Sequence, residues 1–199
     1  MKKYNIKYGY EHRKDYSYFN DMPFTDGWQN EVYQEAIELA EKTEGINFVA
    51  DVGCGSAFKL LKYFNSDAYD ISGYDVEETV RALKAKHPEY PWHISDFDEE
   101  PYEEADMVIC SDVIEHVLDP DDLCNFLKKF KAKKYVISTP DRDLVYGGHD
   151  HNGPPNNPTH IREWNFSEFR DYISSHFQIE RHWISNRRQA TQAIICNTK

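Results

Sequence analysis

The chain has 199 residues, with 23 Lys and Arg against 35 Asp and Glu, and a formal net charge of −12 at pH 7. This acidity argues against a general nucleic-acid surface, because phosphate binding needs clustered Lys and Arg, and no apolar run approaches the roughly 18 residues of a membrane span. The length suits one domain with a sizeable core, and four scattered cysteines are typical of free thiols in a reducing compartment, so we expect a single cytoplasmic domain over 1–199, away from membranes.

The first 27 residues are polar and rich in tyrosine, and no hydrophobic region follows the opening lysines, so they do not read as a secretion signal. We interpret residues 1–27 as an N-terminal lid or extension. It could cover a substrate or contact a second copy of the chain, so a homodimer stays open. From Trp28 to Thr43 apolar residues recur with helical spacing up to Gly45, which predicts a helix.

The segment 48–57 combines a buried strand, an acidic residue and a tight glycine turn before a helix. Its apolar run ends around Asp51, and Gly53 and Gly55 leave the backbone bare where a ligand can approach. The third glycine of a dinucleotide-binding turn is missing, since Phe58 stands in its place, and the Asp51 carboxylate would repel a pyrophosphate. The turn therefore favours a positively charged ligand, such as a sulfonium.

A second strand, predicted over 68–75, also ends in an acid. Asp75 lies about twenty residues beyond the glycine turn, where nucleoside-binding α/β folds hydrogen-bond ribose hydroxyls. Helices are expected near 57–65 and 77–87. A further helix opens at Asp119, because a cap residue, a proline and two acids suit a helix N-terminus.

The second half of the chain continues the alternation of strands and helices. Residues 105–111 and 135–139 predict strands, and 166–175 predicts a helix with a capping-box start. The last two runs, 177–184 and 190–196, read as an antiparallel hairpin. The order predicts a doubly wound, mostly parallel α/β sheet that binds its ligand at the carboxyl ends of the strands.

Between about Trp28 and Trp164 the motifs resemble those of class I S-adenosylmethionine-dependent methyltransferases. The glycine turn matches the family's first motif, with Ala57 at its third glycine, and residues 105–117 resemble the D-x-V-x-x-x-x-V-x-E-H-V run of the small-molecule branch. The resemblance implies a seven-stranded Rossmann-like sheet and S-adenosylmethionine as cofactor. It implies these cofactor-binding residues: Trp28, Asp51, Gly53, Gly55, Asp75, Asp96, Phe97 and Ser111.

The connection 140–163 is long and has no obvious secondary structure, which is typical of a functional loop, and we interpret it as a substrate loop. With its flanks it resembles methyltransferases found with bacterial surface-sugar machinery, which implies the sugar-type branch and a small-molecule or glycan acceptor. Four arginines stand out in the acidic chain: Arg142, Arg162, Arg187 and Arg188. If two or more face the pocket, the acceptor carries an anion.

Asp112, Glu115 and His116 would share one face if their segment is helical. Two carboxylates and an imidazole can hold Mg²⁺ or Mn²⁺, and the spacing resembles the E-x-x-E-H of some small-molecule and RNA-terminus O-methyltransferases, which add a later histidine. His160 would be that ligand. Two other histidines could replace it: His149 and His151. A plain capping box explains the spacing equally well, so we prefer a metal-free site in which His116 and His160 are catalytic.

The function that these observations predict is methyl transfer from S-adenosylmethionine to a hydroxyl of a small sugar-like or polyhydroxylated acceptor. Three alternatives stay open. One is an RNA 2′-O-methyltransferase, which the net charge disfavours. The others are an N- or C-methyltransferase and a non-catalytic S-adenosylmethionine-binding protein.

Overall fold

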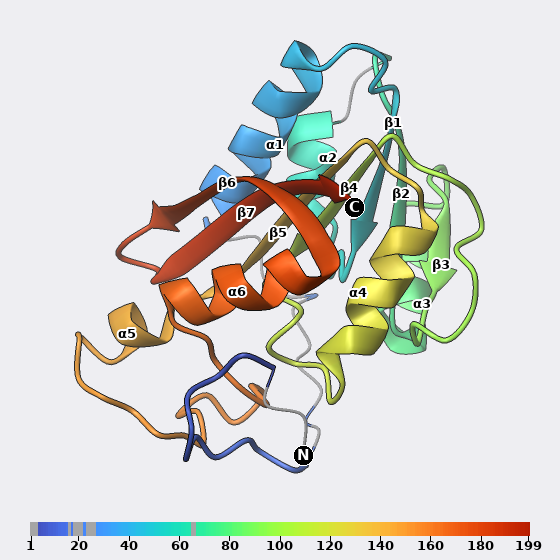
Figure 1. Cartoon of the computed structure of the whole chain (residues 1–199). Coiled ribbons are helices and arrows are strands. Elements are labelled where there is room, and N and C mark those ends of the chain that lie inside the picture. Colours follow the sequence, from blue (N-terminus) through green and yellow to red (C-terminus); the bar gives the residue numbers. More distant parts are fainter. Residues whose placement is uncertain (1–3, 16, 18–21, 23–26, 65–66) are drawn as a thin grey trace.

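The protein folds around one seven-stranded sheet with the strand order β3-β2-β1-β4-β5-β7-β6 (Figure 1). The computed structural model describes residues 4–15, 17, 22, 27–64 and 67–199. The strands are β1 (Phe48–Val52), β2 (Asp70–Asp75), β3 (Trp92–Ile94), β4 (Met107–Ser111), β5 (Lys134–Pro140), β6 (Phe177–Asn186) and β7 (Thr191–Thr198). The first five pair in parallel, whereas β7 is antiparallel to both β5 and β6. This confirms the predicted fold class.

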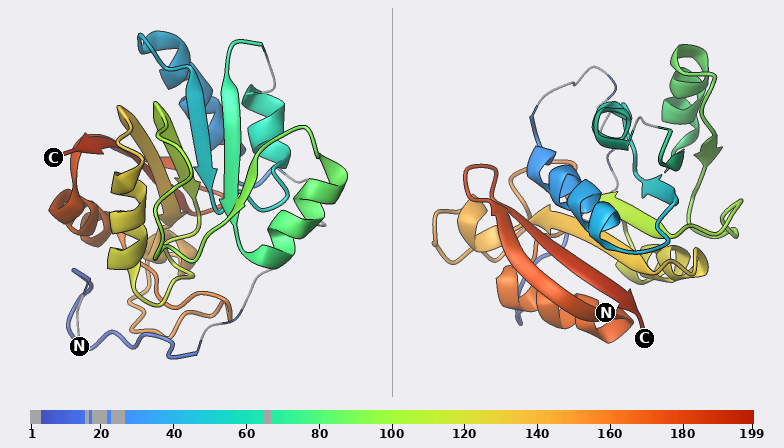
Figure 2. Two further views of the ribbon diagram at one scale, coloured as in Figure 1. Left: turned by 90° about the vertical axis from the view of Figure 1, so that its right-hand side faces the viewer. Right: turned by 90° about the horizontal axis from the view of Figure 1, so that it is seen from above.

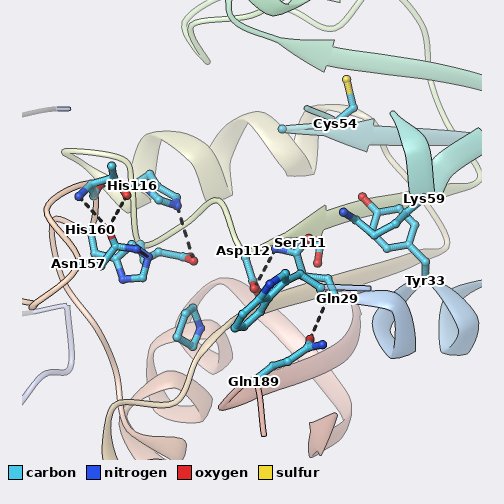
Figure 3. Close-up of a pocket in the computed structure, with 15 residues that line it drawn as sticks. Gln29, Tyr33, Cys54, Lys59, Ser111, Asp112, His116, Asn157, His160 and Gln189 are labelled. Carbon is cyan, nitrogen blue, oxygen red and sulfur yellow. Dashed lines mark hydrogen bonds and ion pairs between the residues drawn. The ribbon is translucent and has the colours of Figure 1, made fainter. Parts of the chain in front are cut away.

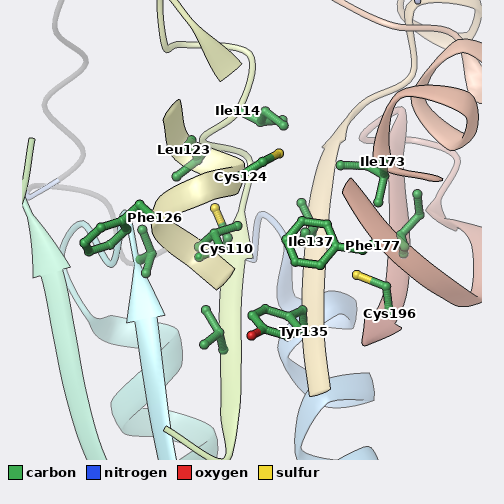
Figure 4. Packing of buried hydrophobic residues seen from close by; sticks show 14 of the residues in the cluster. Cys110, Ile114, Leu123, Cys124, Phe126, Tyr135, Ile137, Ile173, Phe177 and Cys196 are labelled. Carbon is green, nitrogen blue, oxygen red and sulfur yellow. The ribbon is translucent and has the colours of Figure 1, made fainter. Parts of the chain in front are cut away.

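Helices cover both faces of the sheet (Figure 2). The helices are α1 (Asn30–Lys42), α2 (Phe58–Phe64), α3 (Glu77–Lys86), α4 (Pro120–Lys129), α5 (Arg142–Val145) and α6 (Phe166–His176). Side chains of α1, α2 and α3 pack on one face, and those of α4 and α6 pack on the other. Because successive residues of a strand point to opposite faces, β4 supplies Met107 to the first layer and Cys110 to the second, where aromatic side chains fill the space (Figure 4).

Two segments differ locally from the expectation. Residues 113–116 form a turn after Asp112, which has a left-handed φ of 54°, so the condition that Asp112, Glu115 and His116 share a helical face is not met. The loop 140–163 contains the short helix α5, whose first turn is capped by Asp141 through a 2.9 Å bond from the Leu144 N–H. The predicted helix at Trp28 begins two residues later, at Asn30.

The N-terminal segment, residues 4–15, lies against the loop 150–164 (blue and orange in Figure 1). The Glu11 N–H donates to the carbonyl of Asn152 at 2.7 Å, and the Arg13 N–H donates to that of Ile161 at 2.8 Å. The remainder of the predicted lid, at 1–3, 16, 18–21 and 23–26, lies outside the described residues. In the part of the chain that the structure describes, no helix combines the length and apolar character that a membrane crossing requires.

Candidate functional site

Two cavities meet at the carboxyl ends of the parallel strands. One has a volume of about 460 Å³ and lies over the glycine turn and the end of β2. The other has a volume of about 360 Å³ and lies between β4, the start of α1 and the loop 157–160 (Figure 3). Gly53, Asp112 and His116 line both cavities, so the two form one continuous cleft.

The glycine turn is fixed by contacts that only glycine permits. Gly53 has a φ of +75°, and a Cβ atom there would lie 2.2 Å from Cγ2 of Val113. The Gly55 N–H donates to Oδ2 of Asp75 at 2.8 Å, and the Val76 N–H donates to Oδ1 at 2.7 Å. Burial raises the pKa of Asp75 despite these bonds. The turn therefore holds this carboxylate at the wall of the larger cavity.

Asp51 lies beneath the cleft. Its carboxylate is fully buried and accepts a 2.8 Å hydrogen bond from the hydroxyl of Tyr33, and it is Tyr33 that lines the smaller cavity. Tyr33 therefore connects Asp51 to a ligand in this cavity by hydrogen bonding. Ala57, at the third glycine position of the motif, has a φ of +54°, a conformation that glycine adopts more readily.

The other predicted cofactor residues line the cleft. Asp96 and Phe97 border the larger cavity. Trp28, whose side chain is 52% exposed, and Ser111, whose hydroxyl lies 2.9 Å from that of Ser138, border the smaller one. Thus all eight predicted residues lie at the cleft or, for Asp51, directly below it.

Asp112 stands between the two ends of the smaller cavity (Figure 3). Its Oδ1 accepts from the Ser138 hydroxyl at 2.6 Å, and its Oδ2 accepts from the Gln29 amide at 3.0 Å. Burial raises the pKa of Asp112, and these two bonds oppose that effect. Lys59 and Tyr33 lie at one end of the cavity, and the histidines lie at the other.

The two predicted catalytic histidines are neighbours, with ring centroids 4.9 Å apart. Nδ1 of His116 lies 3.0 Å from the carbonyl of Thr159. Since a carbonyl only accepts, Nδ1 carries the proton and Nε2 carries the lone pair. Burial, with His160 nearby, lowers the pKa of His116 to about 4, so this imidazole is neutral near pH 7.

His160 is held from both sides. Its Nδ1 lies 2.7 Å from Oε1 of the buried Glu163, and its Nε2 lies 2.9 Å from the amide nitrogen of Asn157. The Asn157 oxygen accepts from the N–H and the hydroxyl of Thr159, at 3.0 and 2.8 Å, which identifies the other amide atom as nitrogen. That nitrogen only donates, so the neutral His160 carries its proton on Nδ1 and donates it to Glu163.

Glu115 is a buried carboxylate beside these rings. Its Oε2 accepts from the Thr139 hydroxyl at 2.9 Å, while Oε1 lies 3.9 Å from Nε2 of His116 and has no hydrogen-bond partner among the described residues. Burial and the Asp112 carboxylate raise the pKa of Glu115 well above its ordinary value. This acid therefore lacks a compensating positive charge.

The predicted metal ligands are only partly brought together. Candidate ligand atoms of Glu115, His116 and His160 all lie within 4.8 Å of one another. Asp112 is not in that group. The two substitutes also lie elsewhere: His149 is exposed, and His151 stacks on Tyr146 with ring centroids 3.7 Å apart.

Arginines that face the cleft would indicate an anionic acceptor. None of Arg142, Arg162, Arg187 and Arg188 lines either of its two cavities. Arg142 is buried in an ion pair with Glu168, with 2.7 Å between Nη1 and Oε2. Arg162 is buried against main-chain carbonyls. The other two are exposed at the turn between β6 and β7.

Sequence reasoning missed several residues of the smaller cavity. Gln189, in the β6–β7 turn, accepts from the N–H of Gln29 at 3.0 Å and donates to the carbonyl of Gly27 at 3.1 Å. No local pattern marks this residue. Lys59 could have been found, because it closely follows the glycine turn. Other missed residues include Asn157 and Thr159, which line the cavity beside His160.

A family model described as a methyltransferase domain matches residues 27–184. A search of curated proteins finds no match to the sequence. Among solved structures, a chain of the Haloferax volcanii complex between the Trm112 methyltransferase activator and a methyltransferase is 13% identical, with 92% of this chain and 99% of that chain covered and a TM-score of 0.66. The methyltransferase domain of bacterial CtHen1-C is 18% identical, with 85% and 98% covered and a TM-score of 0.66.

A third similar structure is magnesium protoporphyrin IX methyltransferase (ChlM) from Synechocystis PCC 6803 with bound SAH. It is 14% identical, with 86% of this chain and 84% of that chain covered and a TM-score of 0.61. These identities are low, so the likeness shows a shared fold, whereas the family model spans most of the chain. The protein therefore belongs to the methyltransferase-domain family, with the fold of the class I S-adenosylmethionine-dependent methyltransferases.

Proposed function

We propose that this protein transfers the methyl group of S-adenosylmethionine to a hydroxyl of a small, polyhydroxylated acceptor. The observation that carries the proposal is the pair of imidazoles in the smaller cavity: His116 also lines the larger one, and His160 is backed by a buried carboxylate. Methyl transfer from a sulfonium mainly requires positioning. A hydroxyl acceptor also has to lose its proton, which calls for a base beside it.

The larger cavity suits the nucleoside of the cofactor. Asp75 stands at its wall with both carboxylate oxygens already oriented by backbone N–H groups, ready to accept from ribose hydroxyls. The methionyl part then enters the smaller cavity past Gly53. There Lys59, at the end away from the histidines, suits the methionyl carboxylate, and the Asp112 carboxylate suits the positive charges of the cofactor.

His160 is the proton acceptor in this proposal. Oε1 of Glu163 accepts from Nδ1 of His160 at 2.7 Å. The Glu163 carboxylate thereby stabilises the imidazolium that forms when Nε2 takes a proton. The acceptor hydroxyl replaces the Asn157 amide at Nε2. His116 is less suited to this role, because burial lowers its pKa to about 4 and its Nδ1 faces only a neutral carbonyl.

The lining of the smaller cavity supports a sugar-like acceptor of the predicted branch. The partly exposed indole ring of Trp28 offers an apolar surface. The neutral polar side chains of Thr159 and Gln189 offer hydrogen bonds to hydroxyls. The volume of about 360 Å³ has to hold the methionyl tail as well, so only a small acceptor or the end of a glycan fits. The small cavity and the net charge of −12, which disfavours binding to phosphates, together favour a small cytoplasmic molecule over RNA as the acceptor.

The residues also fit a divalent metal ion. Glu115, His116 and His160 would hold it, because a buried carboxylate oxygen without a hydrogen-bond partner and two imidazoles are suitable donors. A bound Mg²⁺ or Mn²⁺ would supply a positive charge that lowers the pKa of the acceptor hydroxyl. Asp112, already bonded to Ser138 and Gln29, is left out of this donor set.

Transfer of radiolabelled methyl from S-adenosylmethionine into fractionated cell extract tests the proposal. We expect label in the small-molecule or glycan fraction, and we expect His160→Ala to abolish it while cofactor affinity in calorimetry stays unchanged. Loss of label in chelator would establish the metal, and persistence would exclude it. Label confined to RNA would overturn the small acceptor. Cofactor binding without label in any fraction would favour the non-catalytic alternative.

A further inference from the structure

A third cavity, of about 600 Å³, lies between the N-terminal segment and the main chain that follows each of the two histidines. It is lined by residues 10–14 of that segment together with Tyr4, Leu118, Ile161 and Arg162. Leu118 also lines the larger cavity of the cleft, and Ile161 directly follows His160. The third cavity therefore adjoins the nucleoside half of the cleft at Leu118, and Arg13, which lines it, bonds the main-chain carbonyl of His160.

Arg162 brings a buried positive charge to this cavity. Its side chain is 2% exposed, and its three nitrogens bond only neutral acceptors. Nη1 donates to the Val117 carbonyl at 2.7 Å, Nη2 donates to the Leu118 carbonyl at 2.6 Å, and Nε donates to Nδ1 of His12 at 3.3 Å. A guanidinium has five N–H groups, so two of them are not used by these bonds.

Arg13 lines the same cavity, and its half-buried side chain is held by two hydrogen bonds. Its Nε donates to the carbonyl of His160 at 3.2 Å, and its Nη2 donates to that of Pro155 at 2.5 Å. Lys14 adds an exposed ammonium. Within the described residues, none of Arg13, Lys14 and Arg162 forms an ion pair, and Glu11 is the one acid in the lining.

The two guanidiniums are thus oriented before any ligand arrives, each by the backbone beside one histidine of the site. Arg13 bonds the carbonyl of His160 itself, and Arg162 bonds the carbonyls of the two residues after His116. A buried charge is costly unless it is paired, and this chain carries 12 more negative than positive charges, none of which forms an ion pair with these arginines within the described ranges. The charge of Asp119 already acts on the buried Arg162, and an anion bound between the two guanidiniums would add a second counter-charge.

We propose that this cavity binds an anionic group of the acceptor, a phosphate or a carboxylate, while the acceptor hydroxyl lies at His160. The inference rests on the proposed function and names the substrate class of the same site. Oriented guanidiniums recognise phosphate and carboxylate through paired hydrogen bonds. The aromatic wall supports a ring next to the anion, since Tyr4 already lies under the Arg162 guanidinium at 4.8 Å from its ring centroid. The acceptor is then a sugar phosphate or a sugar acid.

Binding of small ligands to the full-length chain, measured by calorimetry and NMR, tests this inference without relying on methyl transfer. The probes are inorganic phosphate, ribose 5-phosphate and glucuronate, with ribose as the neutral comparison. We expect the anions to bind at least about tenfold more tightly than ribose. The double variant Arg13→Gln, Lys14→Gln should remove that advantage, and high salt should weaken it. Lys131→Gln is the matched control, because Lys131 is an exposed lysine paired with Glu104, away from the cavity.

Each outcome decides between the two proposals. Equal binding of ribose and the anions, or a preference that the double variant leaves intact, would overturn the anion site even if methyl transfer is observed. An anion preference that depends on Arg13 and Lys14, with no transfer to any acceptor, would support the anion site and overturn the proposed function. Inorganic phosphate binding that does not compete with ribose 5-phosphate would overturn the link to the acceptor.

Discussion

The two halves of the cleft are built in different ways. The nucleoside half comes mainly from residues 53–97 and 112–122, and its key contact joins Gly55 to Asp75 across 20 positions through a backbone N–H. The acceptor half comes from six separated segments, at 28–33, 53–59, 111–116, 140, 157–160 and 189. There the contacts run between side chains or from side chain to backbone, across 83 positions from Gln29 to Asp112 and 160 from Gln29 to Gln189.

The difference teaches what each half can tolerate. A site made of strand ends and backbone N–H groups depends on a few φ angles and one carboxylate. A site made of buried side chains depends on every element that carries them, including the hairpin β6–β7 and the N-terminal segment. Changes in the first half should therefore act on the fold or on cofactor affinity, and changes in the second half should act on turnover.

The largest effect should follow from adding one carbon to the glycine turn. In Gly53→Ala the new Cβ would meet Val113 at 2.2 Å while the residue keeps a φ of +75°. Overpacking and the left-handed conformation together should cost about 2–5 kcal/mol in the free energy of unfolding. Gly147→Ala is the control, because φ is +61° there but nothing lies within 4 Å. Urea unfolding of both variants measures the difference; equal losses would show that packing against Val113 is unimportant.

Glu163→Gln should separate the two halves most clearly. The amide can still accept from Nδ1 of His160 but no longer stabilises an imidazolium, so methyl transfer should fall by about 100-fold. Cofactor affinity, measured by calorimetry, should not change. Asp143→Asn removes a 57% exposed charge from the same loop and should leave transfer intact. A matching fall in cofactor affinity for Glu163→Gln would contradict the division into two halves.

Asp75→Ala tests the nucleoside half. Loss of a charged acceptor for the ribose hydroxyls should weaken cofactor binding by about 1.5–3 kcal/mol, or roughly 10- to 100-fold. Asp67→Ala is the control, since Asp67 is exposed and precedes the start of β2, at the end of the strand opposite Asp75. Calorimetric titration with S-adenosylhomocysteine reports both affinities. An unchanged affinity in Asp75→Ala would remove this residue from the cofactor site.

The smallest effect concerns Ala57, which has a φ of +54° where many family members have glycine. Ala57→Gly removes a left-handed penalty of about 1–2 kcal/mol and adds about 0.4–1 kcal/mol of unfolded-state entropy. We expect a gain in stability of up to about 1 kcal/mol, measured by thermal unfolding, and no change in transfer. A loss of stability would mean that the methyl group of Ala57 packs usefully in the core.

Local patterns were enough to predict most of the nucleoside half. The strand 48–52, the glycine turn and Asp75 follow from apolar runs, from residues that permit a positive φ and from the reach of one βαβ unit, and all of these are properties of neighbouring residues. The C-terminal hairpin was predictable for the same reason. The sheet order then places these strand ends at one edge.

Tertiary structure decided most of the acceptor half, although His116 and His160 were predicted from the sequence. The spacing of Asp112, Glu115 and His116 would place all three on one face of a helix, but the segment is a turn. Asp112 bonds Ser138 and Gln29, and the loop brings His160 to the other two. Arg142 and Arg162 looked alike in the sequence, yet one is neutralised by Glu168 and the other faces a cavity. These outcomes depend on contacts between residues that are far apart along the chain, and local periodicity carries no information about such contacts.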